Sequence, residues 1–320
     1  MKLVTASSVI ASLWLAASLR CAAQESYPVR PVTIVVPFSA GSQPDILART
    51  LAEAMAKSTS QPVVVLNREG AAGTIAVASV AQARPDGYTL GFGPNGQFSI
   101  QTHLLRDLAY KVEQFDFLCQ TNSGAYALVV GPGSPYKTLA ELIDAARRAP
   151  GKLNLGSIGH ATIPHLVGES IGLEAAVKFT HVPFKASGDM ITQTLNGSVD
   201  FTITTPAALA GGSALRALAL VAENRSPRYP EVPLLKEQGF KRSSLPGYIG
   251  LYGLKGIPAD AAGWLRRSCA QSAETPGFRQ ASEKVGAPQL YADAPAYNAN
   301  MIEDHRYMGE LLRTLGVKPQ

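Results

Sequence analysis

Short apolar runs alternate with segments of helical periodicity through the first ninety or so residues. A β-branched run at 32–36 stops at Pro37, which is typical of a buried strand. Leu47, Leu51 and Met55 then fall on one face of a predicted helix. The elements expected in this unit are strands at 32–36, 62–66 and 88–92 and helices at 46–57 and 74–83. This strand–helix–strand order predicts a parallel sheet with helices on both faces.

The pattern starts again near residue 125, after a less regular stretch. Thr138 and Glu141 form a capping box at the start of a helix that is expected to end near residue 149. The other expected elements are strands at 125–130, 153–155, 178–182, 201–204, 217–221 and 249–254 and helices at 259–273, 276–285 and 295–316. We therefore expect two α/β units, with the chain leaving the first near residue 127 and returning near residue 248. Ligands of such sheets lie beyond the carboxyl ends of the strands, which places the site in a cleft between the units.

The loop at 37–45 is the first that could bind a ligand. Ser42 and Asp45 have the spacing of a capping box, and Pro44 suits a first helical turn. The backbone amides left free in this arrangement are those of Ala40, Gly41, Ser42 and Gln43. They suit an anion, because a helix N-terminus carries unpaired donors and a partial positive charge. The alternative is that Ser42 and Asp45 only cap the helix.

A second loop, at 155–165, repeats the order of strand, small residues and capped helix. Thr162 is the expected N-cap, and the hydroxyl groups of Ser157 and Thr162 could hold a second anionic group. A serine nucleophile on a sharp turn needs glycine two residues earlier, and Leu155 occupies that position. His165 is interpreted as a packing residue of the helix. We therefore expect binding rather than hydrolysis at this loop.

A third candidate is the G-x-G-x-x-G pattern of residues 91–96, with Asp116 twenty residues beyond it. This is the spacing of a dinucleotide-binding loop. Pro94, however, lacks the amide that a pyrophosphate would need, and no clear helix is expected to open at residue 96. We interpret the segment instead as a loop that contributes Pro94, Asn95 and Gln97 to the cleft.

The rest of the chain offers no catalytic or metal-binding pattern. His103, His160, His181 and His305 have no paired spacing for a metal, and no two carboxylates form an acid–base pair. Cys119 and Cys269 are expected to be two buried thiols, although one bridge between them is an alternative. The sequence therefore predicts a protein that binds rather than one that catalyses, with no cofactor.

Charge and the first residues change the picture in two ways. The net charge of +5 comes with basic residues that cluster only in pairs, without interleaved aromatics, so nucleic acid is not an expected partner. Lys2 precedes an apolar stretch at 3–19, and Cys21-Ala22-Ala23 ends in small residues. This predicts a secretory signal at 1–23. Arg20 disfavours the alternative of a lipoprotein anchor at Cys21.

Several stretches, in this order along the chain, resemble one family of exported proteins. They are Tyr27-Pro-Val-Arg-Pro31, Pro37-Phe38 with Gly41 and Asp45, the run from Ala83 to Leu90, Ser157-x-Gly159 with Thr162, and His181-Val-Pro-Phe-Lys185. The chain resembles the substrate-binding proteins of tripartite tricarboxylate transporters, the Bug family of solute receptors. The resemblance covers the chain from Tyr27 nearly to its end.

The resemblance implies a two-lobed periplasmic binding protein of the Venus flytrap type. Two parallel-dominated sheets flanked by helices would be joined by a double crossover hinge. Lobe 1 would comprise residues 24–126 and 249–320, and lobe 2 residues 127–248. Such a protein would be a monomer that holds a small carboxylate, without a metal, and passes it to membrane permease subunits or to a sensor.

The resemblance also implies which residues contact the solute. The contacts carried onto this chain are Phe38, Ser39, Ala40, Gly41, Ser42 and Asp45 in lobe 1 and Ser157, His160, Ala161 and Thr162 in lobe 2, with Phe184 and Lys185 closing over the ligand. Family members usually have glycine at positions 42 and 161 and tyrosine at position 184. The less polar pocket favours an aromatic or short aliphatic acid over citrate. The alternative function is an exported α/β hydrolase that uses Ser157 in the same cleft.

Overall fold

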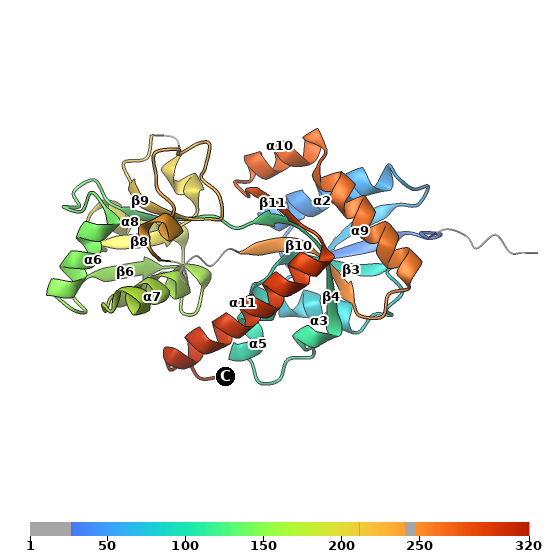
Figure 1. Ribbon diagram of the computed structural model, residues 1–320, viewed down its shortest axis with the longest axis horizontal. Helices are drawn as coiled ribbons and strands as arrows, with labels where there is room; N and C mark the ends of the chain where they lie inside the picture. Colours follow the sequence, from blue (N-terminus) through green and yellow to red (C-terminus); the bar gives the residue numbers. More distant parts are fainter. Residues whose placement is uncertain (1–26, 211, 241–246, 320) are drawn as a thin grey trace, which may run out of the picture.

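The computed structural model describes residues 27–210, 212–240 and 247–319, which form two α/β lobes (Figure 1). The predicted signal at 1–23 lies outside the described residues. We call the part around the six-stranded sheet lobe 1 and the part around the five-stranded sheet lobe 2. The chain crosses between the lobes twice, and this establishes the two-lobed α/β fold that the sequence indicated.

The sheet of lobe 1 has the strand order β11-β4-β10-β3-β1-β2. Its strands are β1 (Val32–Val36), β2 (Val63–Asn67), β3 (Thr89–Pro94), β4 (Phe115–Ser123), β10 (Tyr248–Leu254) and β11 (Gln289–Ala292). Both β2 and β3 pair parallel with β1, whereas β10 lies antiparallel between β3 and β4. The carboxyl ends of β1, β2 and β3 therefore meet at one edge of this sheet.

The sheet of lobe 2 has the order β7-β6-β8-β5-β9. Its strands are β5 (Tyr126–Val130), β6 (Asn154–Ser157), β7 (Thr180–Pro183), β8 (Phe201–Thr204) and β9 (Arg216–Val221). The strands β7 and β8 pair parallel with β6, and β5 is antiparallel to β8 and β9. The carboxyl ends of β6 and β7 are therefore adjacent.

Both sheets are mixed, so the expectation of parallel-dominated sheets is wrong. The reason is the second crossing of the chain between the lobes. Because β10 returns from lobe 2, it enters the sheet of lobe 1 at the end where β4 leaves it, and it must run against β3 and β4. Parallel pairing is found among β1, β2 and β3, and the first candidate loop follows β1.

The helices pack around the two sheets. They are α2 (Gln43–Ala56), α3 (Thr74–Ala81), α4 (Gly96–Ser99), α5 (Gln101–Leu104), α6 (Leu139–Arg148), α7 (Ile163–Ala175), α8 (Ser187–Leu195), α9 (Ala259–Ala273), α10 (Pro276–Lys284) and α11 (Ala294–Thr314), with short 3-10 turns between them. Leu47, Leu51 and Met55 of α2 are buried, as their spacing predicted. No helix in the described part of the chain is long and apolar enough to cross a membrane.

The last helix, α11, belongs to both lobes. Tyr297 and Met301 pack with the aromatic residues of lobe 1. About two to three turns further on, Met308 and Leu311 join the apolar core of lobe 2. Figure 1 shows this long helix running from the centre of the molecule toward α7. The two lobes are therefore linked by packing as well as by the two crossings.

The two crossings lie against each other at a pair of glycines. The Gly124 amide, just after β4, donates a hydrogen bond to the carbonyl of Gly247, just before β10. A side-chain carbon at position 124 would lie 3.2 Å from the Gly247 backbone, so this close approach depends on glycine. The two connecting segments are thus held together at one point.

Cys119 of β4 and Cys269 of α9 form a disulfide, so the expectation of two buried thiols is wrong. The two Cα atoms are 6.5 Å apart, although the residues are 150 positions apart in sequence. The bridge forms because α9 packs directly on β4. Sequence distance alone gave no sign of this contact.

Candidate functional site

The loop between β1 and α2 is anchored by Asp45, whose side chain is buried. Its carboxylate accepts hydrogen bonds from the Gly41 amide at 2.8 Å and from Asn67 Nδ2 at 2.8 Å, and it forms an ion pair with Arg49 at 3.0 Å. Burial by itself would raise the pKa of Asp45, but the hydrogen bonds from Arg49, Gly41 and Asn67 outweigh it and hold the pKa below its ordinary value. Asp45 is therefore a buried anchor of the loop.

Ser42 occupies the N-cap position of α2, but its side chain makes no capping hydrogen bond. The expected capping box of Ser42 and Asp45 is therefore wrong, because Asp45 bonds back to Gly41 instead. The Ser42 hydroxyl is buried and has no hydrogen-bond partner among the described residues. A helix also leaves its first amides without intrahelical partners. The start of α2 therefore offers unused donors.

A turn of small residues lies beside this loop. Gly70, Ala71, Ala72 and Gly73 all have positive φ values. A side-chain carbon at Gly73 would lie 2.9 Å from Pro37 Cβ and 2.6 Å from Gln97 Nε2. Gln97 in turn donates to the Ala72 carbonyl at 3.1 Å. The structure thus brings Gln97 to the turn at 70–73, beside the first loop.

Pro94 and Asn95 lie at the end of β3, beside the segments after β4 and before β10 that cross between the lobes. The Asn95 amide donates to the Tyr248 carbonyl at 2.9 Å, and Asn95 Nδ2 donates to Asp304. Asn95 Oδ1 is buried without a partner in the described part of the chain. Asn95 therefore joins β10 and α11 at the crossing, whereas Pro94 simply ends the strand.

The G-x-G-x-x-G segment differs from the expectation in one respect. A short helix, α4, does begin at Gly96. It has four residues and is followed at once by α5, so it is far from the long helix of a dinucleotide-binding unit. Asp116 forms an ion pair with Arg266 at 2.7 Å. The acidic residue of the pattern is therefore engaged elsewhere.

The second candidate loop follows β6 and is closed by hydrogen bonds. Ser157 Oγ donates to the Gly159 carbonyl at 2.9 Å, and Thr162 Oγ1 donates to the same carbonyl at 2.9 Å. Thr162 is the N-cap of α7, as predicted, although its side chain forms no capping bond to the helix. The Phe184 amide donates to the Ser157 carbonyl at 2.8 Å. Ser157, Thr162 and Phe184 are therefore brought together at the carboxyl ends of β6 and β7.

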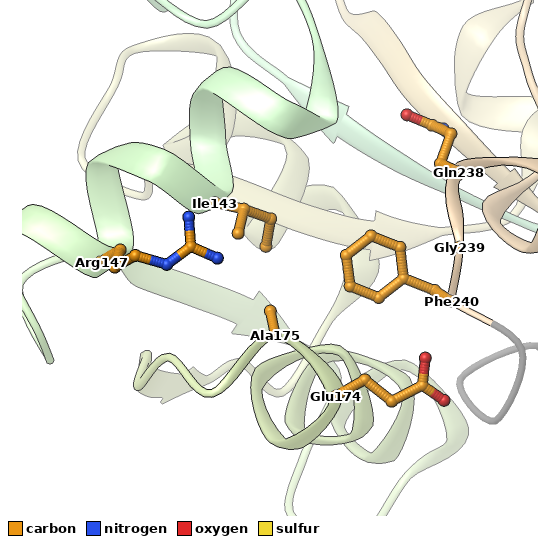
Figure 2. Close-up of a pocket in the computed structure, with 7 residues that line it drawn as sticks. All are labelled: Ile143, Arg147, Glu174, Ala175, Gln238, Gly239 and Phe240. Atoms are coloured by element: carbon orange, nitrogen blue, oxygen red, sulfur yellow. The ribbon is translucent and has the colours of Figure 1, made fainter.

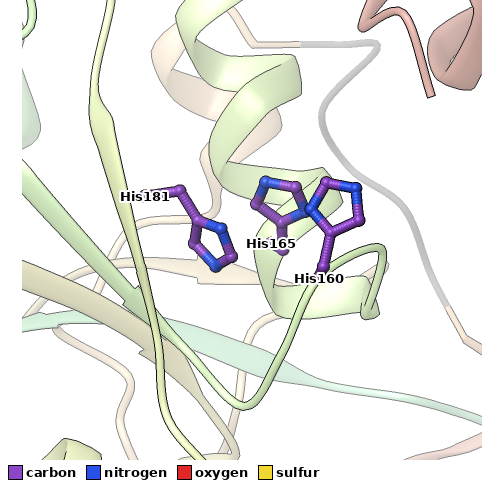
Figure 3. Close-up of side chains that lie close together, drawn as sticks. All are labelled: His160, His165 and His181. Atoms are coloured by element: carbon purple, nitrogen blue, oxygen red, sulfur yellow. The ribbon is translucent and has the colours of Figure 1, made fainter.

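Three histidines gather beside Ser157, although their positions in the sequence have no paired spacing for a metal. One nitrogen from each of His160, His165 and His181 lies within 4.8 Å of the others. Figure 3 shows the three rings side by side. The sequence concealed this cluster because His181 lies on β7, which only the parallel pairing of β6 and β7 brings to the loop.

The histidines differ in environment. His165 is buried, as expected of a packing residue, His181 is half-buried and His160 is exposed. The rings of His165 and His181 are stacked with centroids 3.8 Å apart. Burial, followed by the neighbouring histidines, lowers the pKa of His181 to about 4. His181 is therefore neutral at neutral pH.

The pair formed by Ser157 and His181 resembles a nucleophile with its base, because Ser157 Oγ lies 2.7 Å from His181 Nε2. Ser157 is, however, completely buried, and its hydroxyl proton is directed to the Gly159 carbonyl. Ala161, with a φ of 55°, and Phe184 lie in the same loop region. Lys185 beside them is exposed to solvent. This arrangement offers donors and a small apolar wall rather than an accessible nucleophile.

The predicted site residues form two groups. Phe38, Ser39, Ala40, Gly41, Ser42, Asp45 and Gln97 lie around the start of α2, and Ser157, His160, Ala161, Thr162, Phe184 and Lys185 lie around the start of α7. Within the described residues, no hydrogen bond joins one group to the other. His165 belongs to the second loop by sequence, but its contacts with His181 and with Glu169, one turn further along α7, emerge only from the fold.

A hollow of about 430 Å³ lies on lobe 2, away from both groups. It is lined by Ile143 and Arg147 of α6, by the end of α7 and by residues 238–240. Figure 2 shows Phe240 and Ile143 pointing toward each other across it. The candidate loop lies at the opposite end of α7, about 18 Å away by helix geometry. We therefore place the functional site at the helix N-termini and not in this hollow.

Comparison with known proteins identifies the family. The model for the tripartite tricarboxylate transporter family receptor matches residues 47–317, and the chain belongs to this family. A TctC solute-binding protein from Polaromonas is 27% identical, has a TM-score of 0.80, and is matched over 90% of this chain and 100% of that one. Receptors of this family are periplasmic, bind small carboxylates and work with tripartite transporters. The protein is accordingly a solute-binding receptor and not an enzyme.

Two further solved structures carry a named ligand. An R. palustris protein solved with adipate is 27% identical with a TM-score of 0.72, over 92% of this chain and 100% of that one. MatC from Rhodopseudomonas palustris, solved with malate, is 26% identical with a TM-score of 0.68, over 89% of this chain and 100% of that one. Both ligands are dicarboxylates.

Proposed function

We propose that this receptor binds a dicarboxylate with an apolar body between the start of α2 and the start of α7, one carboxylate at each helix. The observation that carries the proposal is the repeated construction of the two loops. Each follows the carboxyl end of a parallel strand, and each leads into a helix with proline in its first turn. A helix N-terminus stabilises an anion by about 0.3–1 kcal/mol, and by up to ~2 kcal/mol when partly buried.

The donors at the start of α2 support one half of this proposal. The buried Ser42 hydroxyl has no partner among the described side chains and backbone groups, and a buried hydroxyl without a partner is costly. A solute carboxylate would satisfy it. Asp45 does not oppose this carboxylate strongly, because the Arg49 guanidinium compensates its charge and Asn67 donates a hydrogen bond to it.

The second loop supports the other half and the apolar body. The amides of residues 160, 162 and 163 would face the second carboxylate, while Ala161 and Phe184 contribute carbon. The relative solved with adipate has a ligand of this kind, with four methylene groups between its carboxylates. We therefore rank adipate-like acids, followed by aromatic acids, above citrate.

The cellular role extends the same proposal. Residues 1–23 would direct the chain to the periplasm and be removed after Ala23, and the mature receptor would be a monomer. Residues 24–126 and 249–320 would form lobe 1 and residues 127–248 lobe 2, with α11 spanning both. The receptor would deliver its solute to the permease subunits of a tripartite transporter or to a sensor.

The test is a thermal-shift screen of residues 24–320, stripped of carried-over ligand, followed by calorimetric titration of each acid that raises the melting temperature. Ligand at one hundred times its Kd stabilises the folded state by about 2.7 kcal/mol. Adipate should bind at least tenfold more tightly than hexanoate, which has the same carbon chain and a single carboxylate. Stronger binding of citrate than of every dicarboxylate and aromatic acid would contradict the apolar body. Equal binding of adipate and hexanoate would contradict the two-helix site.

A further inference from the structure

The histidine cluster beside the second loop is assembled from three separate segments of lobe 2. His160 lies in the loop after β6, His165 in the first turn of α7, and His181 on β7. The centroids of the His160 and His165 rings are 4.9 Å apart, and those of His160 and His181 are 6.2 Å apart. Three imidazoles that converge in this way are the usual ligands of zinc and similar cations.

The hydrogen bonds of His181 leave the correct nitrogen for a metal. In the tautomer of His181 that carries its proton on Nε2, His181 donates to Ser157 Oγ at 2.7 Å while the Ser157 hydroxyl donates to the Gly159 carbonyl. This tautomer leaves the Nδ1 lone pair free. A metal-binding histidine typically donates its other N–H to a neighbouring acceptor, and here Ser157 is that acceptor.

His165 has a similar neighbour in Glu169. His165 Nε2 lies 3.5 Å from Glu169 Oε1, one turn further along α7, so the carboxylate can accept the Nε2 proton. His165 Nδ1 accepts the Ala161 amide at 3.0 Å, on the side of the loop that carries His160. A cation at this nitrogen would replace the amide of Ala161, a buried residue of the loop next to His160.

We propose that His160, His165 and His181 bind one divalent transition-metal cation of the zinc type, with Ser157 and Glu169 orienting two of the rings. The exposed His160 provides the approach from solvent, and the buried His165 provides the base of the site. Three protein ligands leave a fourth tetrahedral position open to water or to an anion. The site does not depend on which solute the receptor carries.

Metal binding should also change the ring geometry. A metal lies in the plane of each imidazole that binds it. The rings of His165 and His181 now make an interplanar angle of 27°, so both cannot direct a lone pair at one cation without opening this angle. Loss of the stacked arrangement is therefore an expected accompaniment of binding.

The test uses residues 24–320 prepared without a histidine tag, titrated with Zn²⁺ by calorimetry and with Co²⁺ by visible absorption. The proposal predicts one Zn²⁺ per chain and the ligand-field bands of tetrahedral Co²⁺. His160→Ala removes an exposed ligand and should weaken Zn²⁺ binding by about tenfold or more, whereas Glu169→Gln should weaken it by about 10–100-fold. Ile158→Ala, at an exposed position of the same loop, is the matched control and should bind Zn²⁺ as the unaltered chain does.

Two outcomes would overturn the proposal. One is the absence of stoichiometric Zn²⁺ binding by a chain that melts cooperatively. The other is Zn²⁺ binding that His160→Ala and His181→Ala both leave unchanged, which would place the metal elsewhere. Adipate titrations in the presence of EDTA test the solute site separately, so failure of one proposal is distinguishable from failure of the other.

Discussion

The hydroxyl oxygens of Ser170 and Tyr307 lie 2.6 Å apart, which joins α7 of lobe 2 to α11. Ser170 is buried at this contact. The same helix packs Tyr297 and Met301 into lobe 1 and Met308 into lobe 2. The helix that begins in one lobe therefore completes the core of the other.

Loss of a buried side chain from the second half of α11 should destabilise both lobes together. Leu311→Ala removes a buried side chain from the core of lobe 2, and a cost of about 2–5 kcal/mol is expected. Differential scanning calorimetry should show a lower melting temperature and still a single transition. Ile302→Ala, 69% exposed on the same helix, should change stability by less than about 0.5 kcal/mol. Separate transitions for the two lobes would contradict the shared helix.

Ser42→Ala should weaken adipate binding and leave the ligand-free chain as stable as before. The loss of one hydrogen bond corresponds to about 0.5–1.5 kcal/mol, or roughly twofold to tenfold in Kd. Stability should not fall, because the hydroxyl has no partner to lose among the described residues. Titration calorimetry gives the Kd. Ser79→Ala, whose hydroxyl bonds only within α3, is the control, and an unchanged Kd in Ser42→Ala would remove this residue from the site.

Reduction of the Cys119–Cys269 bridge should destabilise the protein substantially. A disulfide that closes a loop of this length typically contributes about 2–5 kcal/mol. Urea unfolding with and without dithiothreitol, and of the double variant Cys119→Ala with Cys269→Ala, measures the difference. Because both thiols are inaccessible in the folded state, the reductant is added under unfolding conditions. Identical midpoints in all three experiments would contradict the bridge.

Asp304→Asn should remove a pH-dependent loss of stability. Burial raises the pKa of Asp304 to about 6, and the nearby Glu303 adds to the rise. Hydrogen bonds from Ser99 and Asn95 and the nearby His305 oppose this rise. The phenols of Tyr248 and Tyr297 also lie close to Asp304. The folded state thus holds this proton more tightly than the unfolded chain. Protonated Asp304 therefore contributes on the order of 3 kcal/mol to the stability of the folded state below about pH 4, and this contribution is lost as the pH rises to 6.

The Asp304→Asn side chain keeps an oxygen that can accept a hydrogen bond from Asn95, but it carries no charge. We expect it to melt higher than the unaltered chain at pH 7.5, with a difference that shrinks toward pH 4. Thermal melts across this range provide the measurement. A parallel pH profile for the two proteins would show that Asp304 titrates normally.

Gly73→Ala should disturb the lobe 1 half of the solute site. The new carbon would lie 2.6 Å from Gln97 Nε2 and 2.9 Å from Pro37 Cβ, at a φ of 88° that alanine rarely adopts. We expect a loss of more than about 1 kcal/mol in stability together with weaker adipate binding. Gly133→Ala, where nothing lies within 4 Å, is the control in urea titrations and calorimetry. Normal adipate binding by a folded Gly73→Ala would separate this turn from the site.

Sequence periodicity predicted helices and buried strands best where local spacing and capping rules determine them. The helix at 259–273 and the strand at 201–204 have the predicted limits, and the capping box of Thr138 and Glu141 is formed by both of its hydrogen bonds. These elements depend on local spacing and local caps. Their prediction therefore needs no knowledge of distant contacts.

The longest strand, β4, was missed because its buried positions include polar residues. Gln120, Thr121 and Asn122 are almost inaccessible, and each forms hydrogen bonds to a distant segment, as Asn122 Nδ2 does with the Ala287 carbonyl. A pattern method interprets such a run as a surface loop. The disulfide was missed for a related reason, since Cys119 lies on the same strand.

The solute loops were located by their small residues and prolines, but the role of individual side chains depended on the fold. Asp45 could have capped the helix, met a solute or faced water, and only the positions of Arg49 and Asn67 decide in favour of anchoring. The histidine cluster likewise requires the pairing of β6 with β7. Tertiary neighbours assign roles that spacing leaves open.

The disulfide has a topological consequence for the molecule as a whole. Its two cysteines enclose every strand from β5 to β9, so the entire sheet of lobe 2 belongs to one covalently closed ring. A protease that cuts a surface loop within this ring would leave the two fragments attached, and only a reducing gel would separate them. When the protein unfolds, the two ends of lobe 2 therefore stay joined through the bridge.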